Sequence, residues 1–456
     1  MKRIGNRAKI LCIVIIYFMA CSGMFAYRYI VNATTWVQHP ANKNIYKNGE
    51  LLSPGRIEMR DGTMLYEASL SGRKYNDDKK LRMATLHTVG DAPGVIGTGL
   101  LNSQRLKFIG YDFLNGVYAG NDSGTTIGLT LDRATCLAAY NALGSHKGTV
   151  GVYNYKTGEI VCMVSTPTYD PTNVPDFKKD SEKYDGVYIN RLLRGLYTPG
   201  SVFKIVTAAA AIETVPDIYE RTFECKGHQT IGGEKVNCSG THGKQSFKKA
   251  FENSCNSAFA QIALLVGAET LEKYVGIAGV RNSYTVDGAT TSAGRFDIHG
   301  AADVNIAWAG IGQYTDLCNP YQFMVLMGAI AGEGKAKSPY FIESIASAIG
   351  VPTHINLNGS ESRTFPEQTA NLLKSLMRGA VETEYGDKNF KDMKVCAKTG
   401  TAEVAGKKPT AWFTGFSDDP QTPLAFVVVV EDSGSGVGVA MPVAKKVMTE
   451  AVKLYK

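Results

Sequence analysis

A serine and a lysine three residues apart, Ser201 and Lys204, stand in the segment YTPGSVFKIVTAAAAIE. Pro199 and Gly200 interrupt the preceding segment and strong helix formers follow, so we expect a buried helix that places both side chains on one face. Burial should depress the pKa of the lysine and leave a neutral amine that accepts a proton. Backbone N–H groups at the helix start can face a developing oxyanion. The pair therefore predicts a serine nucleophile with an adjacent base.

The same spacing occurs twice more, at Ser71 and Lys74 and at Ser246 and Lys249. Neither pair follows a helix-start signal, and neither lies in an apolar helix. Because S-x-x-K by itself most often marks a solvent-exposed pair, we expect these two to be structural, and its context distinguishes Ser201 from them.

A second hydroxyl and an amide follow at Ser254 and Asn256, just before another helical region. Serine and asparagine are common helix N-caps, and that interpretation needs no chemistry. In a functional interpretation, Ser254 passes the proton taken by Lys204 to a leaving amine, while the Asn256 amide binds a substrate carbonyl and holds Lys204 in place. The sequence leaves both interpretations open.

The triplet Lys-Thr-Gly occurs twice, at 156–158 and at 398–400. The first lies between two alternating apolar runs, VYNY and EIVCMV, where Gly158 suits the tight turn of a hairpin. The second lies within a strand-like run, AKTGTAE. We therefore predict a turn at the first triplet and look for chemistry at the second.

In a strand, Thr399 and Thr401 point to the same face and aim two hydroxyls at one anionic group. Lys398 supplies positive charge beside them, and Gly400 lets a substrate backbone lie close to the strand. The N–H of Thr401 is a candidate second oxyanion donor. This segment predicts a clamp for a substrate carboxylate.

The order S-x-x-K, S-x-N, K-T-G is typical of penicillin-interacting serine enzymes. From about residue 127 to its end the chain resembles a class B penicillin-binding protein, a membrane-anchored D,D-transpeptidase of peptidoglycan synthesis. The stretches that carry the resemblance are YTPGSVFKIVTAAAAIE, ENSCNSAFAQIA, AKTGTAE, GEIVCMVSTPTYDP and AWFTGF. Upstream, SPGRIEMRDGTMLYEAS is similar to the opening of the family's pedestal module.

By this resemblance, stem peptides ending in D-Ala-D-Ala and β-lactams would both acylate Ser201. Lys204 would be the base, and Ser254 with Asn256 would relay the proton and orient the base. Lys398, Thr399 and Thr401 would form the clamp for the D-alanine carboxylate, and Gly400 would be a further substrate-binding residue. The resemblance also implies a lipid-linked glycosyltransferase partner in the membrane. No glycosyltransferase-like segment occurs in the sequence, so we do not expect a bifunctional class A enzyme. One stretch departs from the family pattern: GIGQYTDLCNP has Tyr314 and Cys318-Asn319 where the family more often has Gly and Val-Thr, and we therefore expect a different acceptor side of the cleft.

The elements that must position these residues follow from the hydrophobic pattern. Strand-like runs near 149–165 and 394–432 flank helical regions that include 201–213 and 256–279, and an amphipathic helix closes the chain. Strands at both ends with helices between predict an antiparallel sheet packed by helices. We therefore expect an α+β domain of the penicillin-binding and serine β-lactamase type over 127–456, preceded at 33–126 by a small β-containing pedestal without catalytic residues.

A basic N-terminus precedes an apolar run of 18 uncharged residues, 10–27, which Arg28 closes. As a helix, that run nearly crosses a hydrocarbon layer of ~30 Å. Positive charge before the span predicts a cytoplasmic N-terminus and an extracytoplasmic remainder. Cleavage as a signal peptide or lipoprotein is the weaker alternative, because the cleavage sites fit poorly. We expect residues 1–32 to be an uncleaved tail and membrane anchor.

Composition sets further bounds. The formal charge of +7 over 456 residues is modest and scattered, so nucleic-acid binding has little support. Nine cysteines are too few for a disulfide scaffold. Only Cys225 and Cys238 are placed for a bridge, and buried free thiols explain them equally well. No CxxC or HExxH spacing occurs, so we expect neither a metal nor a cofactor.

Two alternatives to a transpeptidase stay open. A serine β-lactamase would use water as the acceptor, and a class A enzyme would need a glutamate shortly after the S-x-N helix. VDGATTSAGRFDIHG offers none, and Asp297 lacks the expected setting. The other alternative is a penicillin-binding sensor or scaffold without transpeptidase activity, against which the intact motifs speak.

Overall fold

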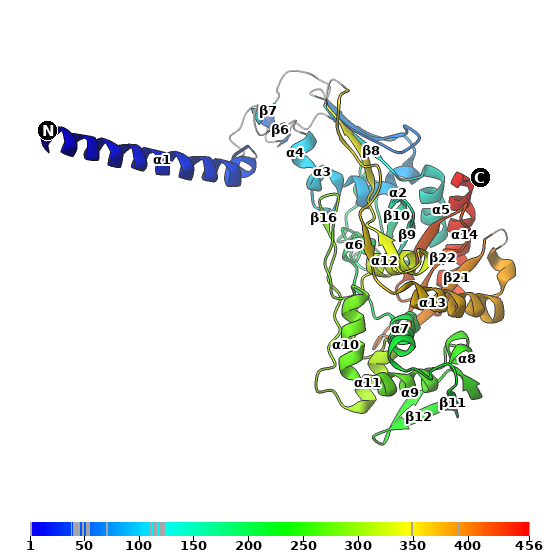
Figure 1. Cartoon of the computed structure of the whole chain (residues 1–456). Helices are drawn as coiled ribbons and strands as arrows, with labels where there is room; N and C mark the ends of the chain where they lie inside the picture. The colour runs from blue at the N-terminus through cyan, green and yellow to red at the C-terminus, as the bar shows by residue number, and fades with distance from the viewer. Residues whose placement is uncertain are drawn as a thin grey trace.

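Five strands from the two ends of the predicted 127–456 domain form one antiparallel sheet (Figure 1). In spatial order they are β10 Ile160–Thr166, β9 Gly148–Asn154, β23 Leu424–Val430, β22 Thr410–Ser417 and β21 Val395–Ala402. Nearly all their residues are buried, which explains the continuous apolar runs of β9, β10 and β23. The predicted α+β class with an antiparallel sheet is confirmed, and β21 forms one edge of that sheet.

The computed structural model describes residues 2–37, 39, 46–47, 50–51, 55–69, 72–108, 111–112, 116–117, 124–347, 350–390 and 393–455. Ser71, the serine of one of the two other S-x-x-K matches, lies outside the described residues, as do several short segments of the predicted pedestal.

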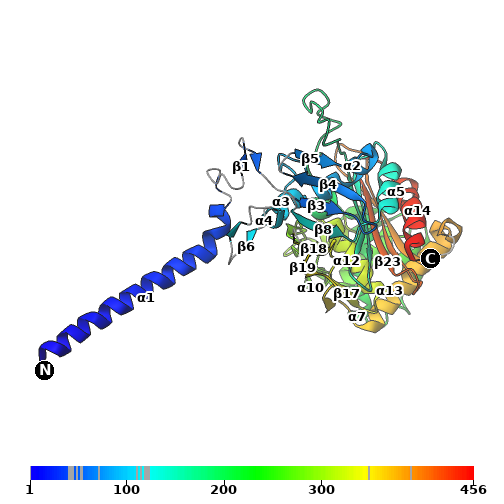
Figure 2. The same ribbon diagram turned by 90° about the horizontal axis from the view of Figure 1, so that it is seen from above.

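Helices cover both faces of the five-stranded sheet (Figures 1 and 2). On one face, α12 Pro320–Ala331 packs against β9, β22 and β23. On the other face, α5 Arg133–Leu143 and the closing helix α14 Met441–Ala451 pack against each other and the sheet. The sheet is thus the middle layer of three, and its side chains join the main hydrophobic core.

A second, six-stranded sheet joins distant parts of the chain (Figure 2). Its order is β19 Pro352–Ile355, β18 Ile342–Ala346, β8 Thr125–Leu129, β3 Gly55–Glu58, β4 Met64–Ser69 and β5 Gly72–Tyr75. Strands of the predicted pedestal therefore pair with strands of the predicted catalytic domain. A helix of the predicted pedestal, α2 Lys79–Val89, also packs against α5 and β10 of the predicted catalytic domain. The domain boundary near residue 126 stays a prediction. Both strand pairing and helix packing connect the residues on its two sides.

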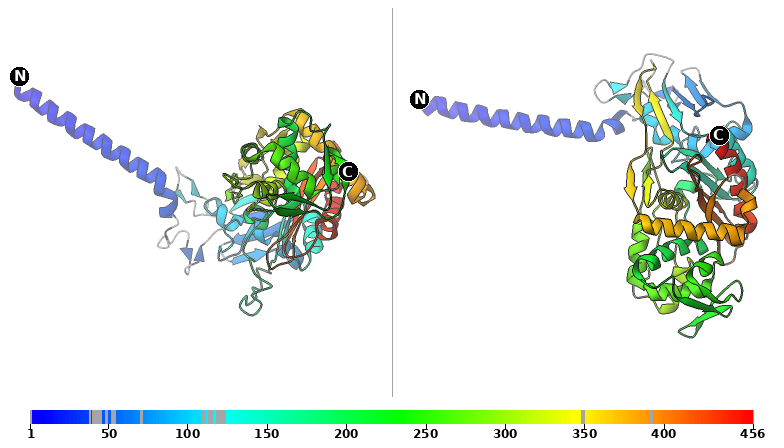
Figure 3. Two further views of the ribbon diagram at one scale, coloured as in Figure 1. Left: turned by 90° about the horizontal axis from the view of Figure 1, so that it is seen from below. Right: turned by 45° about the vertical axis from the view of Figure 1, so that its right-hand side comes forward.

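A group of helices lies beyond the sheet on the side of α7 (Figure 1). It contains α7 Lys204–Thr214, α8 Phe247–Glu252, α9 Asn256–Val266, α10 Ala268–Ile277 and α11 Asp303–Gly310. The helical region predicted over 256–279 is two helices, because Gly267, with φ of 80°, ends the first. α13 Glu367–Ala380 lies between this group and the sheet, in the right-hand view of Figure 3, and packs against β21 and α7.

Two short ribbons are attached to α8 and α9: β11 Thr222–Cys225 pairs with β14 Gly243–Ser246, and β12 His228–Ile231 pairs with β13 Glu234–Asn237. We call residues 222–246 the ribbon lobe. The remaining two-stranded pairs are β1 Tyr46–Lys47 with β2 Glu50–Leu51, β6 Tyr111–Asp112 with β7 Gly116–Val117, β15 Thr285–Val286 with β16 Ala289–Thr290, and β17 Lys335–Lys337 with β20 Glu361–Arg363.

Short helical turns complete the described elements: α3 Leu100–Ser103, α4 Arg105–Phe108, α6 Arg191–Arg194, η1 Gly200–Phe203, η2 Val381–Tyr385, η3 Asp387–Phe390, η4 Gly436–Ala440 and η5 Val452–Tyr455. Two of them, η1 and η2, supply residues to the site described below.

The N-terminal helix α1 Lys2–Val37 extends away from the rest of the molecule (Figures 1 and 2). Within it, residues 5–33 have a mean hydropathy of 2.2 in the most apolar window, and none of that window is buried. By length and composition this helix can cross a membrane, as an N-terminal anchor would.

Candidate active site

Ser201 lies in the 3-10 turn η1, directly before α7, rather than in the first turn of an α-helix as predicted. Gly200 has a φ of +56°, and a Cβ atom there would lie 2.8 Å from the Thr401 carbonyl oxygen. Only glycine fits this close approach. The indole Nε1 of Trp412 donates to the Thr198 carbonyl over 3.0 Å. These contacts fix the nucleophile segment against β21 and β22.

Lys204 is fully buried, and its Nζ atom contacts three of the other predicted site residues. It lies 3.1 Å from Ser201 Oγ, 2.5 Å from the Ser254 carbonyl oxygen and 2.7 Å from Asn256 Oδ1. The last two oxygens only accept hydrogen bonds, so two N–H groups of the amine donate to them. In the neutral amine the lone pair is then free to face Ser201 Oγ, which is the arrangement a general base needs.

Burial lowers the pKa of Lys204 well below the ordinary lysine value, and the nearby charge of Lys398 lowers it further. Burial also lowers the pKa of Lys398, to about 7. The faces of Phe259 and Phe251 lie 5.6 Å and 5.8 Å from the two amines, respectively. The site therefore holds two lysines, of which Lys204 is the one disposed to be neutral.

Ser254 joins the two lysines. Its Oγ atom lies 3.2 Å from Lys204 Nζ and 2.9 Å from Lys398 Nζ, and its backbone has a φ of 54°, which is uncommon outside glycine. The N-cap of α9 is Cys255, whose Sγ accepts from the Ala258 N–H. Neither Ser254 nor Asn256 caps the helix, so the capping interpretation of these two residues is wrong.

Lys398, Thr399, Gly400 and Thr401 lie on the edge strand β21 beside η1, as the sequence predicts for a strand. Lys398 is fully buried, whereas Thr401 is exposed. A Cβ atom at Gly400 would lie 2.7 Å from the Pro199 carbonyl oxygen. The absence of that atom lets β21 lie directly against the segment that carries the nucleophile.

Tyr385, at the end of η2, is a site residue that sequence reasoning missed. Its buried hydroxyl accepts from the Thr399 N–H at 3.2 Å, and it lies 3.0 Å from Thr399 Oγ1 and 3.3 Å from Lys398 Nζ. It therefore fixes the orientation of both clamp residues. No spacing signal marks it, because η2 comes before β21 in an irregular turn.

The first Lys-Thr-Gly triplet is the turn of the β9–β10 hairpin, as predicted. Asn154 Oδ1 accepts from the Lys156 N–H, and Gly158 has a φ of 94°. The Lys156 amine donates to the Pro420 carbonyl oxygen on the surface. This triplet shares no contact with the site.

The Ser246 and Lys249 pair is structural in the same way. Ser246 Oγ caps α8 by accepting from the Lys249 N–H, and the Lys249 amine lies 3.3 Å from a Glu384 carboxylate oxygen. Identical spacing thus produces a helix cap here and a buried nucleophile and base at Ser201.

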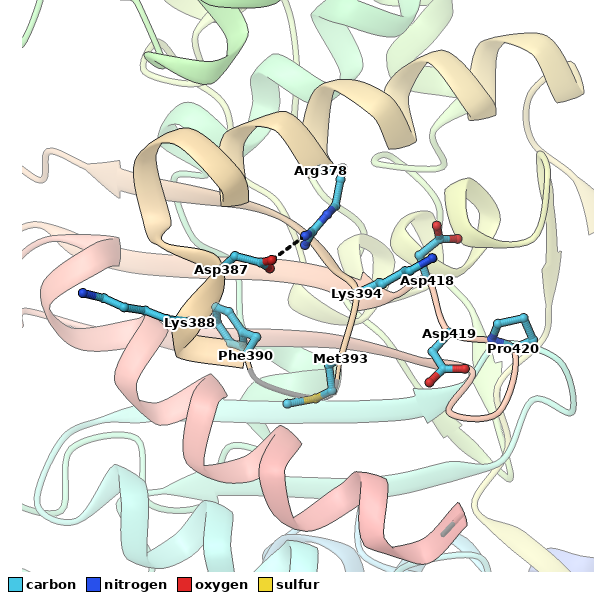
Figure 4. Close-up of a pocket in the computed structure, with 9 residues that line it drawn as sticks. All are labelled: Arg378, Asp387, Lys388, Phe390, Met393, Lys394, Asp418, Asp419 and Pro420. Atoms are coloured by element: carbon cyan, nitrogen blue, oxygen red, sulfur yellow. Dashed lines mark ion pairs between the residues drawn. The ribbon is translucent and has the colours of Figure 1, made fainter.

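A cavity of about 630 Å³ lies away from these residues, and Figure 4 shows its lining. Its charged side chains come from α13, η3, the residue before β21 and the loop after β22, and Arg378 pairs with Asp387 at 2.8 Å. None of the predicted site residues lines it, and its described lining residues include no serine, threonine, cysteine or histidine. The cavity is therefore not the candidate active site.

The model of the penicillin binding protein transpeptidase domain matches residues 148–449. The chain belongs to this family. Its relatives place it among the class B penicillin-binding proteins. Peptidoglycan D,D-transpeptidase PbpA of Mycolicibacterium smegmatis is 26% identical over 372 residues, which cover 73% of each chain. Stage V sporulation protein D of Bacillus subtilis is 28% identical over 318 residues, 66% of this chain and 48% of the relative.

Solved structures of the family share the fold. Penicillin-binding protein A from M. tuberculosis, as a ceftriaxone acyl-enzyme complex, has a TM-score of 0.75 at 22% identity, over 88% of this chain and 99% of that one. The D,D-transpeptidase domain of a peptidoglycan glycosyltransferase from Eggerthella lenta has the same TM-score at 24% identity, over 88% and 98%. The arrangement of sheet and helices is thus that of a penicillin-binding protein.

Proposed function

We propose that this class B penicillin-binding protein is a serine D,D-transpeptidase that cross-links peptidoglycan stem peptides ending in D-Ala-D-Ala. The observation that carries the proposal is the chain of contacts from Ser201 Oγ through Lys204 Nζ and Ser254 Oγ to Lys398 Nζ, with steps of 3.1, 3.2 and 2.9 Å. Relatives named as peptidoglycan D,D-transpeptidases support the same reaction.

In the first half-reaction, Ser201 Oγ attacks the carbonyl carbon between the two D-alanines while Lys204 takes its proton. Ser254 relays the proton to the leaving D-alanine amine. The C–N bond breaks, and an ester on Ser201 remains. The N–H groups of Ser201 and Thr401 serve as oxyanion donors.

The substrate carboxylate binds at Lys398, Thr399 and Thr401, while Gly400 lets β21 lie against the segment that carries Ser201. Asn256 holds Lys204 and presents its amide to the substrate. In the second half-reaction an amine of a neighbouring stem peptide attacks the ester, loses its proton to Lys204 and releases Ser201. A β-lactam also acylates Ser201, but its ring C–N bond opens without releasing a separate amine, and water hydrolyses the resulting ester slowly.

The membrane arrangement belongs to the same proposal. α1 crosses the membrane once, with the N-terminus cytoplasmic and the transpeptidase domain outside, because the basic residues precede the apolar run. A lipid-linked glycosyltransferase in the same membrane would supply the glycan strands, since cross-linking needs polymerised substrate.

The test is a time course of intact mass for the full-length protein in detergent with penicillin. We expect a persistent single adduct that Ser201→Ala abolishes. Ser246→Ala is the matched control, because it removes a serine of identical spacing outside the site, and it should label as the wild type does. No adduct on the wild type would contradict the proposal. An adduct that forms and clears within minutes would favour the β-lactamase alternative.

A further inference from the structure

Four potential metal-binding side chains converge beside the S-x-N motif. They are Cys225 at the end of β11, Cys238 after β13, His242 before β14 and Cys255 between Ser254 and Asn256. One ligand atom from each, three sulfurs and the histidine Nδ1, all lie within 4.8 Å of one another. We call these residues the Cys3His cluster.

The spacing within the cluster fits a tetrahedral ion. The Sγ atoms of Cys238 and Cys255 are 3.8 Å apart, and His242 Nδ1 lies 3.4 Å from Cys225 Sγ and 3.5 Å from Cys238 Sγ. Zinc bonds of about 2.3 Å to sulfur and about 2.0 Å to nitrogen give tetrahedral edges of roughly 3.8 Å between sulfurs and roughly 3.6 Å between sulfur and nitrogen. These three separations match such edges, and the other pairs of ligand atoms lie within 4.8 Å of one another.

Backbone groups around the cluster favour thiolates. The Asn256 N–H donates to Cys238 Sγ at 3.3 Å, and the Ala258 N–H donates to Cys255 Sγ at 3.4 Å. Such N–H donors stabilise the negative charge on metal-bound sulfur and orient the ligand. Three soft sulfurs and one imidazole are the ligand set of structural zinc sites, which keep no open position.

The ribbon lobe needs a cross-link of this kind. Its four strands form two separate two-stranded pairs, and more than half of their residues are not buried. A two-stranded ribbon is marginal by itself, and small units with little core commonly rely on a metal or a disulfide. The Cys3His cluster joins both ribbons to the start of α9.

We propose that Cys225, Cys238, His242 and Cys255 bind one structural zinc ion that anchors the ribbon lobe and positions Ser254 and Asn256. Cys255 lies between these two site residues, and Asn256 Nδ2 donates to the Asn237 carbonyl oxygen of the lobe at 3.0 Å. An ion held by Cys255 fixes the backbone at Ser254, whose φ is positive. The ion would act on the site through the backbone of Cys255, so its proposed effect on the chemistry is one of position.

The rival arrangement is a disulfide among the same cysteines, for which the sequence singled out Cys225 and Cys238. A disulfide uses two of the sulfurs and gives no role to His242 or to the remaining cysteine. In the structure all nine cysteines carry free thiols. The zinc site accounts for all four side chains.

The first experiment measures bound zinc in the full-length protein, purified in detergent without chelators, by mass spectrometry of the metal. We expect about one zinc per chain, and tetrahedral thiolate absorption after exchange with Co²⁺. Cys225→Ser and His242→Ala should lose the metal. Cys136→Ala and His228→Ala, outside the cluster, are the matched controls and should keep it.

Two results together would overturn the site in favour of a disulfide. The wild-type protein would hold less than about a tenth of an equivalent of zinc, and its mass would be lower than that of the fully reduced chain by two hydrogens for each pair of cysteines. Equal metal in the ligand variants and the controls would also overturn it. Because these measurements use the wild type as well as variants, misfolding of a variant does not decide the outcome.

The second experiment tests the positioning role, which rests on the proposed function. Removal of zinc with a chelator should slow penicillin acylation of Ser201 by about 10–100-fold, and added Zn²⁺ should restore it. Unchanged acylation after complete zinc loss would overturn the positioning role. A zinc-loaded protein that never acylates would contradict the proposed function while the metal site stands.

Discussion

Two serine and lysine pairs with the same spacing have opposite surroundings. Ser201 and Lys204 lie between the edge strand and buried helices, and the lysine has no exposed surface. Ser246 and Lys249 begin a short helix at the surface, and the lysine pairs with carboxylates there. The two Lys-Thr-Gly triplets divide in the same way, into a strand beside the nucleophile and a hairpin turn. Burial and neighbouring groups, rather than the motif letters, make the chemistry.

The largest expected effect comes from the base. Lys204→Met keeps the length and burial of the side chain but removes the amine, so penicillin acylation of the full-length protein should slow by about 10²–10⁴-fold. Lys249→Met removes the corresponding lysine of the other pair, and its acylation rate should stay within about twofold of the wild type. Equal rates in the two variants would contradict the assignment of Lys204.

The clamp lysine should come next. Lys398→Met removes the charge that attracts a substrate or penicillin carboxylate, and a lost buried charge partner costs about 2–5 kcal/mol, or at least about 30-fold in the acylation rate constant. Lys156→Met, in the turn triplet, is the control and should leave that constant unchanged. With a penicillin ester, which has no free carboxylate, the wild type and Lys398→Met should have the same acylation rate constant.

The third prediction concerns pH. Lys398 is charged below its pKa of about 7 and neutral above it, whereas the strongly lowered pKa of Lys204 keeps that amine available as a base. The second-order acylation constant should therefore fall by roughly tenfold per pH unit above about 7. Stopped-flow measurements of acylation between about pH 6 and about pH 9 will check this. Lys398→Arg should move the fall to higher pH, and a flat wild-type profile would contradict it.

The smallest effect should be one on stability alone. Ser246→Ala removes the N-cap of α8 and should cost about 1 kcal/mol, seen as a lower unfolding temperature. The acylation rate should not change. Substituting Ser246 by Asp, which restores a capping oxygen, should recover the unfolding temperature. Slower acylation in Ser246→Ala would show that the surface pair contributes to the site after all.

Much of the fold could be predicted because the pattern is local. The strands β9, β10, β21, β22 and β23 and the helices α5, α7 and α14 follow the apolar runs closely. The break at Gly267 was missed, because apolar residues continue at helical spacing on both sides of it. The joining of β18 to β8 could not be predicted either, because strand pairing across such a separation leaves no local pattern.

Some residues of the site could be predicted from the sequence and others could not. Ser201, Lys204, Ser254, Asn256 and Lys398 meet as the motif order suggested, whereas Tyr385 and the Cys3His cluster came only from the structure. The four cluster residues had a weak signal, a cysteine at the centre of S-x-N and a histidine among cysteines. Their spacing matches none of the short metal motifs, because the two ribbons rather than one turn bring them together.

The pairing of β8 with β18 has a consequence for how the chain is made. Thr130 Oγ1 at the end of β8 contacts the Tyr340 carbonyl oxygen, 210 residues further along. When β8 leaves the ribosome, its partner on that side, β18, has not yet been synthesised. The early strands must wait with an open edge while most of the transpeptidase sheet is still unsynthesised, and open edges invite association with other chains. The six-stranded sheet can therefore be completed only after β18 has been made, and until then the early strands must stay apart from those of other copies.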